Sequence, residues 1–263
     1  MHTVLDRPEV LQVLFHPRKN YGSPYSTTDV RLISVGVEPG VRVGGRLYPA
    51  ESNSPLIIFF HGNGEIAAEY DEIAEFYHQI GVTFLVWDYR GYGLSTGTPT
   101  VGNLLKDAAA LFERTPDICR TNKLDPKRTY IMGRSLGSAS AIEVAVRSSK
   151  GLMGIIIESG FSDTFSLLSR LGVRIKSINE DSDGFGNLTK IMKVEIPLLV
   201  IHGEADVLIP PHNGRELFEG CGTQQKRLVL IPGGGHNDLM FVGLKTYFDA
   251  LEAFVYKDEV DRN

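Results

Sequence analysis

The chain has 263 residues, of which 42% are hydrophobic and 22% are charged, and its formal net charge is -5. This usage is ordinary for a globular protein and excludes collagen-like, coiled-coil and disordered chains. The mild negative charge excludes the basic surface that nucleic-acid binding requires, so we expect no nucleic-acid partner.

The first predicted elements form an antiparallel pair. Residues 30–37 and 41–47 are rich in β-branched side chains, and the turn at 38–40 between them contains Pro39 and Gly40, which predicts a hairpin. Residues 56–60 form a continuous apolar run, which is typical of a strand buried on both faces of a parallel sheet. Residues 65–80 show helical spacing of apolar side chains. The first thirty or so residues fit neither pattern, and no structure is predicted for them.

From residue 82 onward, predicted strands and helices alternate. The predicted strands are 82–87, 129–132, 152–157, 198–201 and 227–231, and the predicted helices are 101–112, 138–147, 214–218 and 239–256. This alternation favours a doubly wound, mostly parallel sheet with helices on both faces and antiparallel strands at its N-terminal edge. Because no linker interrupts it, we expect a single domain over residues 1–263, with a frayed tail at 257–263.

One long segment interrupts the alternation before the strand at 198–201. It contains a mixed helical piece at 164–178 and a polar piece at 180–187. Connections of about thirty residues inside compact domains are usually functional or mobile. We therefore expect residues 162–195 to form a small cap over a pocket at the strand ends, and a surface excursion without a role is the alternative.

The cysteines and the apolar runs of the sequence indicate whether the protein holds a metal and where in the cell it is located. Cys119 and Cys221 belong to no C-x-x-C pair, which gives no support for a metal or redox site, and we expect free thiols. The longest apolar run, residues 55–60, is too short to cross a bilayer, and the first ten residues lack the apolar stretch of a secretion signal. The sequence therefore predicts a cytoplasmic protein without an integral membrane segment.

The strongest chemical signal is a G-x-S-x-G motif at residues 133–137, between a predicted strand and a predicted helix. Its glycines let strand and helix approach closely, so that Ser135 projects from a tight turn as a nucleophile. The backbone N–H of Leu136 then points from a helix N-terminus toward a developing oxyanion. A helix-capping serine in a glycine turn is the alternative.

A nucleophilic serine needs a base to remove its proton. His236 is the best candidate because it lies in a loop with three glycines, directly after the last strand and before the last helix. Among the other histidines, His16, His78 and His212 are assigned to the surface, and His61 and His202 to turns after buried strands.

The base in turn needs a carboxylate that holds its tautomer. The candidates are Asp206, in the loop after the strand at 198–201, Glu204 two residues before it, and Glu158 at the end of the preceding strand. Asp238 is interpreted as a cap of the last helix.

A second oxyanion donor is expected from residues 61–64, which read H-G-N-G directly after the strand at 56–60. The backbone N–H of Asn63 is the candidate donor. A glycine turn without a catalytic donor is the alternative.

Five motifs follow one another in a fixed order. They are H-G-N-G at 61–64, D-Y-R-G-Y-G at 88–93, G-R-S-L-G at 133–137, H-G-x-x-D at 202–206 and G-H-N-D at 235–238. Over roughly residues 30–255 this order resembles the α/β-hydrolase superfamily, in particular its small single-domain branch of depalmitoylase-like, prolyl oligopeptidase-type and serine aminopeptidase-like proteins. The resemblance implies the α/β-hydrolase fold, a structural turn at 88–93, and a triad in the chain order Ser135, Asp206, His236, which favours Asp206 as the acid.

The predicted reaction is hydrolysis of a small-molecule carboxylic ester or thioester through an acyl-enzyme, with no metal or organic cofactor. One alternative is a peptidase or amidase with the same triad, in which Arg170 or Arg174 would anchor a substrate carboxylate. The other is a non-catalytic binding protein of the same fold. Five apolar residues are candidates either to line an acyl pocket or to pack in the core: Phe161, Phe165, Leu167, Leu168 and Leu171.

Overall fold

The computed structural model describes residues 4–20, 29–176 and 179–256. They form an eight-stranded sheet in the order β1-β2-β4-β3-β5-β6-β7-β8. β1 (Arg31–Glu38) and β2 (Val41–Tyr48) are the predicted hairpin, and β2 pairs antiparallel with β4 (Thr83–Trp87). From β4 onward neighbours pair in parallel, through β3 (Leu56–Phe60), β5 (Thr129–Arg134), β6 (Gly154–Glu158), β7 (Leu198–Gly203) and β8 (Lys226–Ile231).

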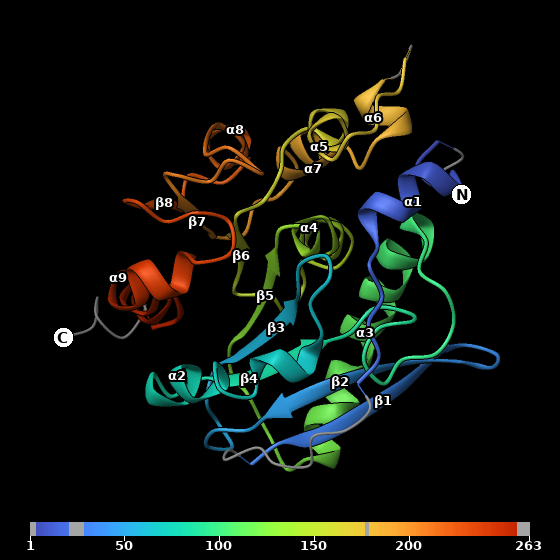
Figure 1. The fold of residues 1–263 in the computed structure, drawn as a ribbon. Coiled ribbons are helices and arrows are strands. Elements are labelled where there is room, and N and C mark those ends of the chain that lie inside the picture. The colour runs from blue at the N-terminus through green and yellow to red at the C-terminus, as the bar shows by residue number, and fades with distance from the viewer. Residues whose placement is uncertain (1–3, 21–28, 177–178, 257–263) are drawn as a thin grey trace.

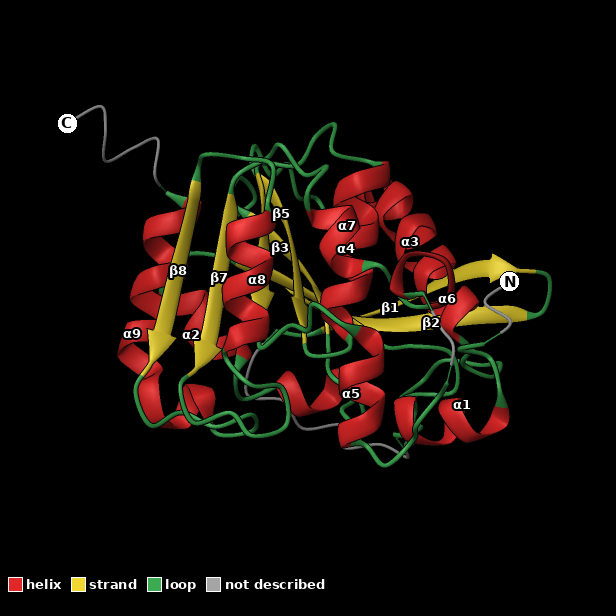
Figure 2. Cartoon of the chain, turned by 90° about the horizontal axis from the view of Figure 1, so that it is seen from above, coloured by secondary structure: helices red, strands yellow, loops and turns green. Residues whose placement is uncertain are grey.

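Helices cover both faces of this sheet (Figures 1 and 2). α2 (Ala74–Gln79) and α9 (Leu239–Val255) lie on one face, and α3 (Val101–Thr121), α4 (Gly137–Arg147) and α8 (His212–Gly220) lie on the other. Every residue of β3, β4 and β6 is therefore buried, which explains why residues 56–60, 84–87 and 155–157 are continuous apolar runs rather than alternating ones. The predicted doubly wound, mostly parallel sheet is confirmed.

Aromatic rings fill the core beneath α2 and α9. The ring of Tyr77 stacks on that of Phe84 with centroids 3.8 Å apart, and the ring of Phe248 meets Tyr77 edge-on at 5.2 Å. Such pairs each contribute about 0.5–1.5 kcal/mol beyond the area that they bury.

The predicted helix at 164–178 ends at Arg170, and those at 65–80 and 101–112 also differ from the observed helices. The predicted helix at 65–80 is a 3₁₀ turn, η1 (Ala67–Tyr70), followed by α2. Asp71 lies in the break, where its carboxylate binds the Arg46 guanidinium at 2.8 Å and accepts a hydrogen bond from the Tyr48 hydroxyl at 2.6 Å. α3 continues past the predicted end at 112 and through Pro116, because Ile118 and Cys119 beyond the proline are buried against the core.

The long connection between β6 and β7 holds α5 (Thr164–Arg170), α6 (Glu180–Asp183) and α7 (Asn187–Ile191). α1 (Pro8–Leu14), which no sequence pattern predicted, contacts α5. In Figure 2 both helices lie at the end of the sheet toward which β7 and β8 point. Residues 177–178 of the predicted helical piece and the predicted frayed tail at 257–263 lie outside the described residues.

None of the helices in the described ranges has the length and apolar character that crossing a bilayer requires. Cys119 and Cys221 are both buried free thiols, as predicted.

Candidate active site

The turn that carries Ser135 is strained. Ser135 follows β5, directly before α4, and its backbone has φ of 52°, in the left-handed region that L-residues rarely adopt. Holding a residue in this region costs about 1–3 kcal/mol, so the surrounding structure must impose it. The Ser135 N–H donates a hydrogen bond of 2.9 Å to the Glu158 carbonyl at the end of β6, which fixes the turn to the neighbouring strand.

Both glycines of the G-x-S-x-G motif are required by close backbone contacts. A Cβ atom on Gly133 would lie 2.1 Å from the Gly137 carbonyl oxygen, and one on Gly137 would lie 2.0 Å from the Phe60 carbonyl oxygen. β5, α4 and the end of β3 therefore approach one another more closely than any side chain allows. This close approach of the three backbone segments places Ser135 at the end of the sheet.

Replacing Gly137 by Ala is expected to lower the free energy of unfolding by on the order of 1–3 kcal/mol, because the new methyl group meets backbone that cannot rotate away. Gly102→Ala is the matched control, since Gly102 also lies in the first turn of a helix and a Cβ atom there would meet only an Asp6 carboxylate oxygen, at 3.7 Å. Urea unfolding of the two variants measures the difference. Equal urea midpoints of the two variants would show that the Ser135 turn is not tightly packed.

A continuous line of hydrogen bonds joins the three predicted triad residues. The His236 Nε2 atom lies 3.0 Å from the Ser135 hydroxyl oxygen, and the His236 Nδ1 atom lies 2.7 Å from an Asp206 carboxylate oxygen. Because the carboxylate accepts the Nδ1 proton, Nε2 is left with a lone pair that faces the serine hydroxyl. This geometry can transfer the serine proton to the imidazole.

Asp206 is a buried carboxylate that accepts hydrogen bonds on both of its oxygens. Its second oxygen accepts hydrogen bonds from the backbone N–H groups of Leu208, at 3.0 Å, and Ile209, at 2.8 Å. Burial raises the pKa of Asp206. The neighbouring His202 ring, whose Nε2 atom lies 3.5 Å away, the hydrogen bond and charge of His236, and the Ile209 N–H together outweigh burial and hold that pKa well below its ordinary value. Asp206 is therefore ionised at neutral pH, where it can stabilise a positive charge on His236.

The other acidic candidates lie elsewhere. Glu204 is exposed to solvent. Glu158 is buried, and its carboxylate binds Arg134 at 3.1 Å and the Tyr247 hydroxyl at 2.7 Å. The interpretation of Asp238 as a cap needs correction: it occupies the N-cap position of α9, but its carboxylate accepts from the Gly235 N–H at 2.6 Å and no helix N–H donates to it. The Asp238 carboxylate therefore binds the preceding loop instead of the first turn of the helix.

The two candidate oxyanion donors lie at the same end of the sheet as Ser135. Leu136 directly follows Ser135 at the start of α4, and Asn63 lies shortly after the end of β3 in the loop 61–66, here called the Asn63 loop. Neither backbone N–H donates a hydrogen bond to any described residue. Among the described residues, neither N–H therefore has an acceptor that a substrate oxygen would have to displace.

The Asn63 side chain anchors its loop. Its amide oxygen accepts from the His16 N–H at 2.9 Å and from the Tyr92 hydroxyl at 3.0 Å, and its amide nitrogen donates to the Val13 carbonyl at 3.1 Å. Tyr92 belongs to the 88–93 turn, so this turn supports the Asn63 loop. Arg90 of the same turn forms a buried ion pair with Asp107 at 2.6 Å.

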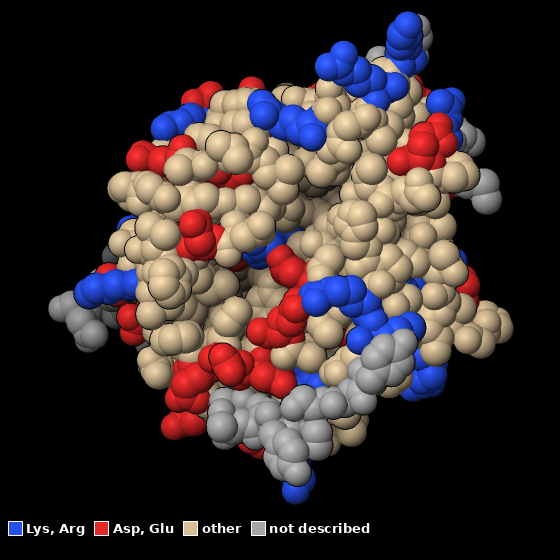
Figure 3. All heavy atoms as spheres, in the orientation of Figure 1, with Lys and Arg blue, Asp and Glu red and all other residues tan. Residues whose placement is uncertain are grey.

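The face toward which the parallel strands point is hollowed near its centre, and acidic and basic side chains meet in the hollow (Figure 3). The apolar candidates for an acyl pocket contribute mainly to packing: Phe161, Leu167 and Leu168 are buried in the core, and Phe165 and Leu171 are partly buried against it. Arg170 is exposed and donates to the Val207 carbonyl at 3.3 Å, and Arg174 is exposed.

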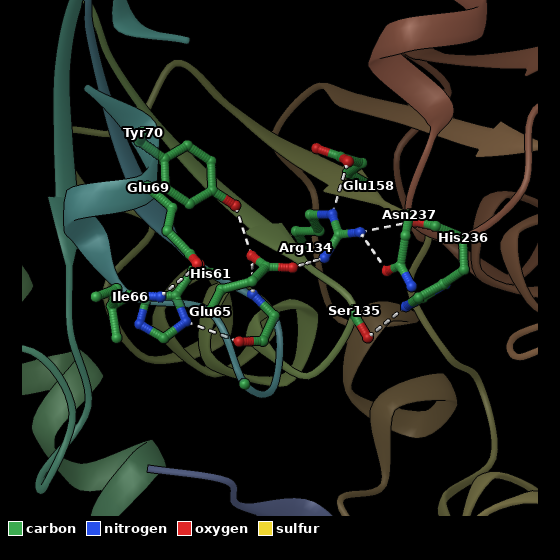
Figure 4. Close-up of polar contacts among 12 residues, drawn as sticks. His61, Glu65, Ile66, Glu69, Tyr70, Arg134, Ser135, Glu158, His236 and Asn237 are labelled. Carbon is green, nitrogen blue, oxygen red and sulfur yellow. Dashed lines mark hydrogen bonds and ion pairs between the residues drawn. The ribbon is translucent and has the colours of Figure 1, made fainter. Parts of the chain in front are cut away.

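Sequence reasoning passed over Arg134, the residue directly before Ser135. Its side chain lies in the middle of the site, between Glu65 on one side and His236 and Asn237 on the other (Figure 4). The available signal was an arginine at the end of a strand whose other residues are apolar or small. Within the described residues, no three histidine, cysteine or acidic side chains are grouped so as to hold a metal ion.

Comparison with known proteins places the chain in a family. The model of the family described as serine aminopeptidase, S33, matches residues 51–164 and 172–240. The human α/β-hydrolase domain-containing protein 17B is 32% identical over 213 residues, which cover 78% of this chain and 67% of the human protein. An uncharacterised protein of Mycobacterium tuberculosis is 28% identical over 232 residues, which cover 88% of this chain and 80% of that protein.

Solved structures show the same fold. An esterase of Pyrococcus furiosus superposes with a TM-score of 0.72 at 19% identity, over 92% of this chain and 98% of the esterase. A monoglyceride lipase of Saccharomyces cerevisiae superposes with a TM-score of 0.68 at 16% identity, over 89% of this chain and 97% of the lipase. The predicted α/β-hydrolase fold is confirmed. Because the family model matches most of its length, the chain belongs to the serine aminopeptidase S33 family of α/β-hydrolases and is a hydrolase.

Proposed function

We propose that this hydrolase cleaves a carboxylic ester or thioester with Ser135 as nucleophile, His236 as general base and Asp206 as the supporting acid. The observation that carries the proposal is the line of hydrogen bonds from Ser135 through His236 to Asp206, at 3.0 and 2.7 Å. Two structural relatives, an esterase and a monoglyceride lipase, support ester substrates.

In the first half of the proposed reaction, the Ser135 hydroxyl oxygen attacks the acyl carbon while His236 Nε2 takes its proton. The carbonyl oxygen becomes an oxyanion, to which the N–H groups of Asn63 and Leu136 donate. Each such donor lowers the barrier by on the order of 3 kcal/mol. The Asp206 carboxylate stabilises the imidazolium that forms.

In the second half, His236 returns the proton to the leaving oxygen or sulfur, and the acyl group stays on Ser135 as an ester. His236 then takes a proton from water, whose oxygen attacks the acyl carbon. Collapse of this second intermediate releases the acid and restores the Ser135 hydroxyl. Each cycle consumes one water and needs no cofactor.

We also infer a single domain in which residues 162–195 cap the site. α5 belongs to this segment, and Arg170 at its end donates to the Val207 carbonyl in the loop that carries Asp206. This contact supports the assignment, because it joins the segment to the proposed triad.

Hydrolysis of p-nitrophenyl esters of increasing acyl length tests the proposed function. We expect a Ser135-dependent rate that peaks at one chain length, since each methylene that fits a pocket is worth about 1–3 kcal/mol and a longer chain no longer fits. Ser135→Ala is the control for spontaneous hydrolysis. A rate no higher than this control on every ester would contradict the esterase proposal.

Amide hydrolysis is the second candidate, and the match to the serine aminopeptidase family favours it. The same triad cleaves amides, with His236 protonating the leaving amine. The exposed Arg170 beside Val207 is a candidate anchor for a peptide carboxylate. Turnover of aminoacyl amides without turnover of simple esters would establish this function in place of the first.

A further inference from the structure

One buried guanidinium group connects the segments that carry the proposed catalytic groups (Figure 4). Arg134 is 7% exposed and ends β5. Its Nη2 atom donates to the His236 carbonyl at 2.7 Å and to the Asn237 side-chain oxygen at 3.2 Å. Its Nη1 atom forms an ion pair with Glu65, and its Nε atom binds Glu158 at 3.1 Å. Every nitrogen of the group therefore has a partner.

Glu65 links Arg134 to the backbone of the Asn63 loop. Its second carboxylate oxygen accepts from the Gly62 N–H at 2.9 Å and from the Tyr70 hydroxyl at 2.6 Å. Gly62 is the residue before Asn63, so the carboxylate that pairs with Arg134 also fixes the backbone next to one proposed oxyanion donor.

Glu158 links Arg134 to α9 and to the Ser135 turn. One carboxylate oxygen binds Arg134, and the other accepts from the Tyr247 hydroxyl of α9 at 2.7 Å. The Glu158 carbonyl accepts from the Ser135 N–H at 2.9 Å. Glu158, which sequence analysis considered as a triad acid, thus joins the serine turn, Arg134 and α9.

We propose that Arg134 is a positioning residue that holds the Asn63 loop and the loop 232–238, here called the His236 loop, in register with Ser135. The inference rests on the proposed function, because it concerns the geometry of that same site. The partner in the His236 loop is the carbonyl of His236 itself, so the hydrogen bond at 2.7 Å restrains the backbone from which the imidazole projects.

The shape of the Arg134 side chain suits this positioning role. A guanidinium presents five N–H donors in one rigid plane, whereas a lysine ammonium is a single point on a flexible stem. Arg134 uses three edges of that plane toward three segments. Lysine at this position keeps the positive charge beside Glu65 and Glu158 but reaches only part of these partners.

Arg134→Lys is therefore expected to lower kcat by about 100-fold and to leave KM within about threefold, because a displacement of about 1 Å at the reacting atoms costs this much in rate. A role in stability alone would lower the amount of folded enzyme and leave kcat per active site unchanged. Titration of active sites with a fluorophosphonate, together with steady-state ester kinetics, separates the two cases.

Arg46→Lys is the matched control. Arg46 is also 7% exposed and binds both oxygens of one carboxylate, that of Asp71, at 2.9 and 2.8 Å, but it makes no hydrogen bond or ion pair to a described residue of either loop. We expect its kcat per active site to equal that of the wild type. If Arg134→Lys and Arg46→Lys have the same kcat per active site, Arg134 has no positioning role.

A second variant keeps the inference testable if Arg134→Lys does not fold. Asn237 is exposed, so Asn237→Ala removes one of the two Arg134 contacts to the His236 loop without opening the core. We expect a fall in kcat of about three- to tenfold with KM unchanged. Wild-type kcat in this variant would overturn the inference while leaving the proposed function intact. A wild-type enzyme that neither turns over substrates nor reacts with the fluorophosphonate would overturn the proposed function first, and this inference with it.

Discussion

Ser135→Ala is expected to remove essentially all hydrolysis, by on the order of 10⁶-fold in kcat, because the missing oxygen is the atom that bonds to the acyl group. The fold should persist. Ser135 is 8% exposed, and the substitution removes only the hydroxyl, which lies 3.0 Å from His236 Nε2. Steady-state kinetics on the best ester and a thermal unfolding curve measure the two effects separately.

Covalent labelling provides a control that does not depend on choosing the right substrate. A fluorophosphonate should add to the wild type at the peptide that contains Ser135, and the Ser135→Ala protein should remain unlabelled. Labelling at another residue, or a variant that retains the wild-type rate, would remove Ser135 from the mechanism. A wild type that resists labelling would instead favour a non-catalytic binding protein of this fold.

Asp206→Asn is expected to lower kcat by on the order of 10⁴-fold, because it selects the wrong tautomer of His236. The N–H groups of Leu208 and Ile209 already donate to one Asp206 oxygen. In the variant, the amide oxygen takes that place and the NH₂ group faces His236 Nδ1. Nδ1 must then accept, so Nε2 carries the proton and cannot take the one on Ser135.

Stability gives an independent readout of the same substitution. The lowered pKa of Asp206 contributes stability above its unfolded-state pKa of about 4, and this contribution disappears as the pH falls through the lower pKa of the folded state. The gap in free energy of unfolding between wild type and Asp206→Asn should therefore narrow below about pH 4. Glu204→Gln, at an exposed position, should leave both activity and stability unchanged. Full activity of Asp206→Asn would reassign the acid to Glu204 or Glu158.

Much of the sheet could be predicted because its strands are buried on both faces. β3 and β4 each consist of five buried residues, and a run of that kind leaves a continuous apolar signal in the sequence. α1 leaves no comparable signal. It has only seven residues, and Val10 and Leu14 are buried against partners that the sequence does not reveal. The end of α3 was mispredicted for the same reason, since tertiary packing beyond Pro116 outweighs the local cost of the proline.

The proposed nucleophile could be found because its requirements are local. The glycines at 133 and 137 and the turn at Ser135 are set by steric contacts between nearby backbone segments, which a short motif encodes. The position of Arg134 in the site has no such motif. Its hydrogen bond to the His236 carbonyl spans 102 positions in the sequence, and its bond to Glu158 spans 24.

The sequence by itself determined the parallel sheet, the serine turn and the family resemblance, because short-range sterics and the burial of whole strands leave patterns in neighbouring residues. Only the tertiary structure decided which carboxylate reaches His236, that Asp238 binds the Gly235 N–H rather than the helix, and that Arg134 joins the Asn63 and His236 loops. These outcomes depend on distances between segments far apart in the chain. Packing sets such distances, and no local pattern records them.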